Sequence, residues 1–277
     1  MPRPQRVYKT PAIVLRQRRL GDADKIVTLY TANYGKLDAV AKGVRRITSR
    51  LAGHVEPLTH SSFLVAHGRN LDIITQAQTI ETFQPLRDDL DRLSRALYAA
   101  ELVDRFTEER SENFALYQLL LDTLRRLAER DDLDFILRFL EMSLLALQGY
   151  RPELRQCVAC RRPLEAEANA WAPGAGGVIC PRCRPDEAAR QAERQEEALT
   201  PLSVNALKVL RLLQRDGFED AARLRIAPEL AAELERHLRV AVHYALDRDV
   251  RSAAFLDAVR RPSRVRPSNA ARSAGPR

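Results

Sequence analysis

The sequence predicts an α+β protein of several domains: a small N-terminal β-barrel, followed by an all-α domain into which a cysteine-rich module is inserted. Three observations predict this organisation. Five short runs rich in β-branched residues, with turn residues between them, fill residues 7–83. Leucines then recur every three or four residues from position 86 onward, and two close pairs of cysteines interrupt that pattern between positions 157 and 183.

The first 84 residues are expected to form the barrel domain. Strands are predicted over 7–20, 25–31, 36–44, 58–66 and 71–80, with turn signals at Gly21-Asp22, at Asn33-Tyr34-Gly35 and over 67–70. Five short strands at this spacing suit a barrel of the OB type, and an SH3-like barrel is the alternative.

From Pro85 the hydrophobic period becomes that of helices, and residues 85–153 and 199–259 are assigned to a helical domain. The apolar stripes consist of Leu86, Leu90, Leu93, Leu97, Ala100 and Val103, then Leu116, Leu120, Leu124 and Leu127, then Leu133, Leu137, Leu140, Leu144 and Leu147. Gly149 and Pro152 are expected to end the third of these helices. Thr200-Pro201 is interpreted as the N-cap and first turn of another helix, and a further helix is expected from about Pro228. Such stripes are typical of core packing.

Four cysteines carry the sharpest chemical signal. Cys157 and Cys160 form one C-x-x-C pair, Cys180 and Cys183 form a second, and the spacing suits one tetrahedral four-thiolate site. Such a site leaves no coordination position for water, so we expect one structural zinc ion in an insertion over 154–198. Reduced core thiols or an iron–sulfur cluster are the alternatives.

Catalytic patterns are weak or missing, and the sequence is interpreted as that of a non-enzyme without a small-molecule substrate. His54-Val55-Glu56 matches the H-x-E half of the nucleobase deaminase signature, but Gln156 and Ile179 stand where that signature requires proline before C-x-x-C. No nucleophile elbow, phosphate-binding loop or H-E-x-x-H motif occurs. Without a run of about 18 apolar residues or a secretory signal, the sequence predicts a cytoplasmic protein with no membrane contact.

Charge is distributed unevenly along the chain. Residues 1–84 carry a net charge of +7 and residues 260–277 carry +6, whereas residues 85–259 carry −5. Basic ends suggest a polyanionic partner, although a solvated surface is the alternative. The C-terminal 260–277 segment, rich in arginine and proline, is expected to be a disordered basic tail.

The basic residues of the barrel are candidate phosphate contacts. We expect Arg16, Arg18 and Arg19 to lie together at the end of the first strand, and Lys36, Lys42 and Arg46 to share one face of the third. Arg45 and Arg50 continue this cluster into a loop. Aromatic rings available for stacking on bases are Tyr8, Tyr30, Tyr34 and Phe63, although most aromatic residues of so small a barrel belong to its core.

Several motifs together resemble a known family. The first part of the resemblance consists of Leu20-Gly21-Asp22-Ala23-Asp24-Lys25-Ile26-Val27-Thr28-Leu29-Tyr30-Thr31, Gly35-Lys36-Leu37 and Ala41-Lys42-Gly43-Val44-Arg45-Arg46. The second part consists of Leu86-Arg87-Asp88-Asp89-Leu90, Tyr98, Glu101-Leu102 and Gly149-Tyr150-Arg151-Pro152 just before Cys157. In this order, over residues 7–258, these motifs resemble the recombination mediator RecO family.

The resemblance implies an OB-fold domain, a helical domain with a zinc module, and a role in DNA repair and recombination. Members of that family bind single- and double-stranded DNA, anneal complementary strands and act with RecR to load RecA onto DNA coated by single-strand-binding protein. The phosphate contacts would be Lys42, Arg45, Arg46 and Arg50, flanked by Arg16, Arg18, Arg19 and Lys36. The acidic tail of single-strand-binding protein docks on the helical domain in this family, and we expect a local basic patch such as Arg125 and Arg126 to receive it. The alternatives are a zinc-ribbon transcription or translation factor and a protein–protein scaffold.

Overall fold

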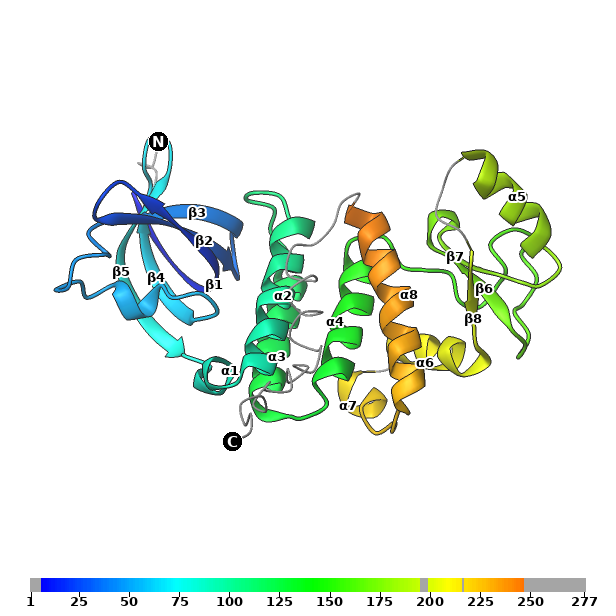
Figure 1. Ribbon diagram of the computed structural model, residues 1–277. Helices are drawn as coiled ribbons and strands as arrows, with labels where there is room; N and C mark the ends of the chain where they lie inside the picture. The colour runs from blue at the N-terminus through cyan, green and yellow to red at the C-terminus, as the bar shows by residue number, and fades with distance from the viewer. Residues whose placement is uncertain (1–5, 195–198, 216, 247–277) are drawn as a thin grey trace, which may run out of the picture.

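A computed structural model describes residues 6–194, 199–215 and 217–246 of the chain. Its parts lie in a row, with the barrel at one end, the helices in the middle and a small sheet with α5 at the other end (Figure 1). The basic tail predicted over 260–277 lies outside the described residues. Within the described part, no helix is both long and apolar enough to cross a membrane.

The barrel has five strands: β1 (Val7–Leu20), β2 (Asp24–Thr31), β3 (Gly35–Ala41), β4 (His60–Ala66) and β5 (Asp72–Glu81). They close in the order β1-β2-β3-β5-β4, in which β3 and β5 run parallel and all other neighbours run antiparallel. A five-stranded closed barrel is OB-like, as the sequence predicts. A short 3₁₀ helix, η1 (Ala52–His54), lies between β3 and β4. The interior is filled by alternate apolar residues such as Val14, Leu29 and Phe63.

The helices of the middle domain are α1 (Gln84–Asp88), α2 (Leu90–Phe106), α3 (Phe114–Glu129), α4 (Leu133–Leu147), α6 (Val204–Arg215), α7 (Phe218–Ala221) and α8 (Pro228–Leu246). The leucine stripes of α3 and α4 pack into the core, which confirms their interpretation as packing surfaces except at Leu147, which is 42% exposed; Leu90 of the first stripe is exposed as well. The first stripe belongs to two helices, because Asp89 is extended and its side chain accepts a hydrogen bond from the backbone N–H of Arg92 (3.0 Å). Gly149 ends α4 as predicted, with a φ of 83° that favours glycine.

The cysteine module is built on a three-stranded sheet, β7 (Gly177–Ile179), β6 (Asn169–Ala172) and β8 (Thr200–Leu202), with a 3₁₀ turn η2 (Pro173–Ala175) and helix α5 (Arg184–Arg194). The predicted N-cap role of Thr200-Pro201 is wrong, because these residues pair with β6. Ser203 caps α6 instead, and its Oγ accepts a hydrogen bond from the backbone N–H of Ala206 (3.1 Å).

One core extends through the helical domain into both neighbours. It includes Trp171 and Val178 of the module and Ile13 and Tyr30 of the barrel, all of which are buried. The module therefore shares the core of the helices, and the helices cover one side of the barrel.

Candidate nucleic-acid interface and metal centre

Basic side chains gather where β1 ends, β2 begins and β3 ends. The strand register sets Arg19 beside Lys25 and Lys25 beside Ala41, so these three ends share one edge of the barrel. The Arg45 guanidinium donates to the carbonyl oxygens of Gly21 (3.3 Å) and Asp22 (2.8 Å), which fixes the loop after β3 against the β1–β2 turn. We call this group the barrel-edge cluster; it comprises Arg18, Arg19, Lys25, Lys42, Arg45, Arg46 and Arg50.

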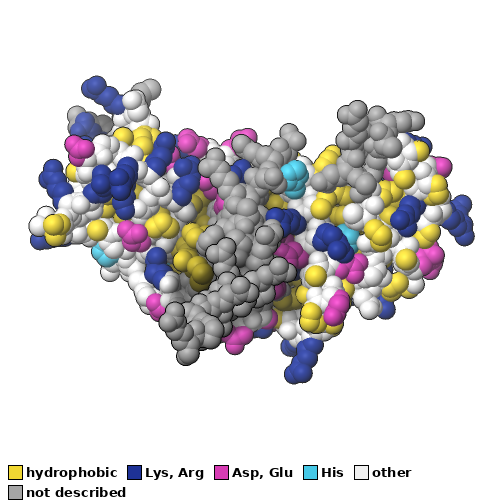
Figure 2. All heavy atoms as spheres, viewed as in Figure 1, with side chains coloured by type: hydrophobic (Ala, Val, Ile, Leu, Met, Phe, Trp, Pro, Cys, Tyr) yellow, Lys and Arg dark blue, Asp and Glu magenta, His cyan; other side chains and the backbone are white. Residues whose placement is uncertain are grey.

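Most of the barrel-edge cluster is exposed, and dark blue side chains are spread over the barrel in Figure 2. Arg18 forms an ion pair with Asp38 (2.9 Å), and Lys25 lies 3.6 Å from Glu56. Among the described residues, no carboxylate lies within 4 Å of the other five members of the cluster. Their positive charge therefore acts on the solvent. Sequence reasoning missed Lys25, which only the register between β2 and its neighbours places here.

Two of the predicted phosphate contacts lie elsewhere. Arg16 Nε and Lys36 Nζ both pair with the carboxylate of Asp104 on α2, at 2.7 and 3.1 Å. Lys36 is also largely buried, and its Nζ donates to the backbone carbonyl of Asp104. The expectation that Lys36, Lys42 and Arg46 share one face of the third strand is wrong, because β3 ends at Ala41 and the other two follow in turns.

The aromatic residues of the barrel are core residues, as expected for so small a barrel. Tyr30 and Phe63 are completely buried, and burial raises the pKa of Tyr30 to about 12. Tyr8 donates from its hydroxyl to Asp72 (2.7 Å) and packs on Tyr34, with 4.5 Å between the ring centroids.

Two further ion pairs join the barrel to the helices. Arg110 donates to Asp72 (2.9 Å), and Arg125 donates through two nitrogens to Glu81 (2.6 and 3.0 Å). The hydrogen bond from Arg125 holds the pKa of Glu81 below its usual value. Because Arg125 is engaged in this way, it is a poor receptor for an acidic peptide. Arg126 covers the ring of Phe218, with 4.1 Å from the guanidinium carbon to the centroid.

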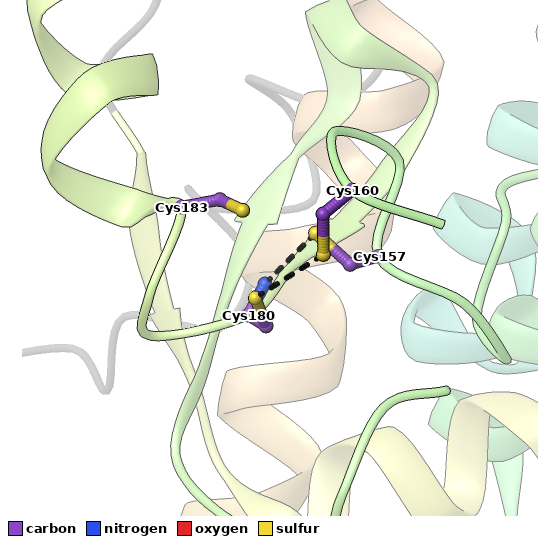
Figure 3. Close-up of side chains that lie close together, drawn as sticks. All are labelled: Cys157, Cys160, Cys180 and Cys183. Carbon is purple, nitrogen blue, oxygen red and sulfur yellow. Dashed lines mark hydrogen bonds between the residues drawn. The ribbon is translucent and has the colours of Figure 1, made fainter. Parts of the chain in front are cut away.

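The four cysteines converge between two loops of the module (Figure 3). All four sulfur atoms lie within 4.8 Å of one another, and the Cys160 and Cys180 sulfurs are 3.9 Å apart. In a tetrahedral site with metal–sulfur bonds of about 2.3 Å, neighbouring sulfurs are roughly 3.8 Å apart, so the arrangement fits one metal ion. The backbone N–H of Cys180 also points at the Cys157 sulfur (3.4 Å).

The electrostatics of this cluster favour a cation. Burial raises the pKa of the Cys157 thiol, but backbone N–H groups of Cys180, Cys160 and Ala159 outweigh it and lower that pKa to about 7. Hydrogen bonds with the Cys160 and Cys180 sulfurs raise the pKa of Cys183 to about 12. Four thiolates at this spacing repel one another, and a bound metal cation removes that cost.

Comparison with known proteins places the chain in a family. A family model described as "Recombination protein O N terminal" matches residues 5–83, and one described as "Recombination protein O C terminal" matches residues 87–254. The chain belongs to the RecO family. It is 43% identical to the DNA repair protein RecO of Roseiflexus sp. over 94% of this chain and 88% of that protein. It is 39% identical to the DNA repair protein RecO of Dehalococcoides mccartyi, over 91% of this chain and 96% of that protein.

This RecO-family chain also contains a pocket that sequence reasoning missed, lined by four arginines and four acidic residues. A cavity of about 910 Å³ lies between α4 and the segment from Ala222 into α8. Arg138 lines this cavity, and its side chain is 6% exposed. Its Nη2 atom donates to Glu141 (2.8 Å), whereas its Nε and Nη1 atoms have no hydrogen-bond partner in the described structure. Arg225 is exposed at the same cavity, next to Leu224 and Ile226. No sequence signal separates Arg138 from the other arginines of the helices.

Proposed function

We propose that this protein is a non-catalytic DNA repair and recombination mediator that binds single- and double-stranded DNA through the barrel-edge cluster and anneals complementary strands. The observation that supports this most directly is the exposed cluster itself, because five of its cations lack a carboxylate partner among the described residues. Membership of the RecO family supports the same function. Arg16 and Lys36 are left out of the proposed contact surface, because Asp104 engages both.

The proposed mechanism is electrostatic. Two complementary strands repel each other through their phosphates, and cations that contact the phosphates of both reduce this repulsion and release condensed counterions. Lysine and arginine side chains on a loop contact the DNA backbone without reading base edges, so binding is expected to be independent of sequence. Ile47 lies fully exposed within the same loop, where it can contact a base.

We infer that the metal is zinc and that its role is structural. Four cysteine thiolates complete a tetrahedral shell, which leaves no position for a reacting water. The residues that would hold the ion are Cys157, Cys160, Cys180 and Cys183. The ion would fix the loops of the module onto the core that it shares with the helices.

The partners that we propose are RecR, RecA on single-stranded DNA, and the acidic tail of single-strand-binding protein, in the cytoplasm at the nucleoid. For the tail we propose the pocket between α4 and α8 in place of Arg125 and Arg126. Its exposed Arg225 can pair with a carboxylate of the tail, and Leu224 and Ile226 beside it offer apolar contacts to the rest of a peptide.

An annealing assay tests the central proposal. Complementary oligonucleotides, free or coated with single-strand-binding protein, should anneal faster with the protein at low salt. Failure to anneal free strands would contradict the proposal. Protection of one specific sequence or RNA structure would favour a transcription or translation factor, and absence of nucleic-acid binding would favour a scaffold.

A second assay tests the peptide pocket. Binding of a labelled acidic tail peptide, followed by fluorescence anisotropy, should weaken about ten-fold in an Arg225→Glu variant. Arg223→Glu is the matched control, because Arg223 is also exposed and pairs with Asp220 (3.5 Å) but does not line the cavity. Equal affinity of the two variants would exclude the pocket.

A further inference from the structure

A small aromatic pocket lies between the end of α4, the β6–β7 turn and the last turns of α8. Its volume is about 180 Å³. Tyr150 and Tyr244 line it and are 51% and 49% exposed, so both side chains are accessible to a ligand. The Tyr244 hydroxyl donates to the carbonyl oxygen of Gly174 (3.4 Å), which links two residues that line the pocket. Exposed rings around a cavity of this size suit one planar group.

Trp171 supplies an unused hydrogen-bond donor at the same place. Its side chain is completely buried and lines the pocket, and its indole Nε1 has no hydrogen-bond partner within the described structure. A buried N–H without a partner is unfavourable, and an acceptor placed in the pocket would supply that partner. The occupant should therefore combine a flat ring with a hydrogen-bond acceptor.

A basic hollow of about 440 Å³ lies along α6, in which Gln214 is hydrogen-bonded to Arg151 and Pro152 of the pocket. Arg155, Lys208, Arg211 and Arg215 line the hollow, and Arg151 connects it to the pocket because it lines the pocket and donates to the carbonyl of Gln214 in α6 (3.5 Å). In the described part of the chain, no carboxylate lies within 4 Å of Lys208 or of the Arg155 guanidinium.

The charge of this surface is exceptional for its part of the chain. Residues 85–259 carry a net charge of −5, yet among the described residues no acidic side chain lines either the pocket or the hollow. Glu153 lies between them in sequence, but its carboxylate accepts hydrogen bonds from the backbone N–H groups of Arg155 and Gln156 (2.6 and 3.1 Å). The surface therefore favours a polyanion.

We propose that the pocket and hollow together form a second site for single-stranded DNA, in which one unstacked base occupies the aromatic pocket and the adjoining phosphates follow the hollow. Every base offers a ring face to Tyr150 and Tyr244 and an acceptor to Trp171, and the phosphates complement Lys208 and the arginines. Stacking platforms combined with a basic groove are the usual means of binding single strands without sequence preference.

This inference deepens the proposed function and rests on it in one respect, namely that the protein meets single-stranded DNA. The barrel and the metal module lie at opposite ends of the molecule (Figure 1). With a site at each end, one molecule holds two strands at once and raises the effective concentration of each for the other. The site also gives a role to the Gly149-Tyr150-Arg151-Pro152 motif, of which all four residues line the pocket.

Trp171 is the only tryptophan of the chain, so its emission reports on this pocket alone. Titration of the full-length protein with oligo(dT) should change the tryptophan emission. Tyr150→Ala should weaken the affinity for oligo(dT), measured from the change in tryptophan emission, about ten-fold, which corresponds to about 1.4 kcal/mol. Tyr150→Phe keeps the ring and should bind like the wild type. Phe114→Ala is the control, because Phe114 is similarly exposed but lies on α3 and does not line the pocket.

A barrel variant in which Lys42, Arg45 and Arg46 are all replaced by Ala separates the two proposals. If the second site exists, this variant keeps the oligo(dT)-induced change in Trp171 emission. If oligo(dT) binds by anisotropy but leaves the emission unchanged in wild-type protein, the second site is overturned and the barrel proposal stands. If the emission changes but the barrel variant anneals as fast as wild type, the barrel proposal fails and the second site stands. The second site would also be overturned if an acidic peptide, but not a second DNA strand, reversed the change in Trp171 emission that oligo(dT) causes.

Discussion

Replacement of Lys42, Arg45 and Arg46 by Ala should reduce the salt dependence of DNA binding without unfolding the barrel. All three side chains are exposed and follow β3, so their loss opens no cavity in the core. The only internal bonds of these side chains that the described structure shows are those from Arg45 to the carbonyls of Gly21 and Asp22. We therefore expect the main effect on phosphate contacts.

The magnitude follows from counterion release. Each lost phosphate contact reduces the slope of log affinity against log salt by about 0.7 for single strands and about 0.9 for duplex DNA. Three contacts give a reduction of about 2 for single strands and almost 3 for duplex. A four-fold rise in salt should therefore weaken single-strand binding by the variant roughly 20-fold less than it weakens binding by the wild type.

The assay is fluorescence anisotropy with a labelled oligonucleotide at several salt concentrations. The matched control replaces Arg16 and Lys36 by Ala, which also removes positive charge from the barrel. Because Asp104 pairs with both, this control should leave the slope within about 0.5 of wild type. It should instead lower the free energy of unfolding by about 1–2 kcal/mol, since it removes contacts between barrel and helices. If the control changed the slope as much as the triple variant, the division of the basic residues into binding and structural groups would be refuted.

Three further predictions concern the helical domain and its junction with the barrel. A Cys157→Ser variant should retain less than one equivalent of zinc, measured with a metal-sensitive dye. Its helices, followed by circular dichroism, should melt at lower temperature, whereas DNA binding at the barrel should persist. A variant that stays fully folded but no longer anneals DNA would instead show that the metal takes part directly in annealing. Glu81→Gln should lower the free energy of unfolding in urea by about 1–2 kcal/mol, because Arg125 loses its carboxylate. The free energy of unfolding should also fall as pH is lowered from about 7 to 5. Burial lowers the pKa values of His60 and His237 in the folded protein, so near pH 6.5 the unfolded chain binds protons at these residues and the folded chain does not. Acid therefore favours the unfolded chain. Urea unfolding at each pH measures this loss, which should be smaller in a His60→Gln variant.

The sequence predicted those features that neighbouring residues determine together. Two residues between paired cysteines allow one turn to present both sulfurs, so the C-x-x-C spacing was sufficient to predict convergence of Cys157, Cys160, Cys180 and Cys183. The strand pattern likewise predicted the five strands to within three residues at each end, because alternation and turn signals are local. The Thr200-Pro201 error has the same local origin. Those residues suit a helix start, but pairing with β6 makes them a strand, and Ser203 can cap α6 equally well.

The division of the basic residues could not be predicted, because it depends on how the barrel meets the helices. Arg16 and Arg18 are two positions apart on β1, and alternation assigns them to the same face of the strand. Arg16 nevertheless pairs with Asp104, 88 residues away, whereas Arg18 pairs with Asp38 within the barrel. Alternation thus identifies the face of a strand on which a residue lies. Whether a cation on that face pairs with the helical domain or remains available to DNA depends on how far along the strand it lies from that domain. The cations of this barrel therefore form two populations, and the contacts with Asp104 of α2 identify the structural one.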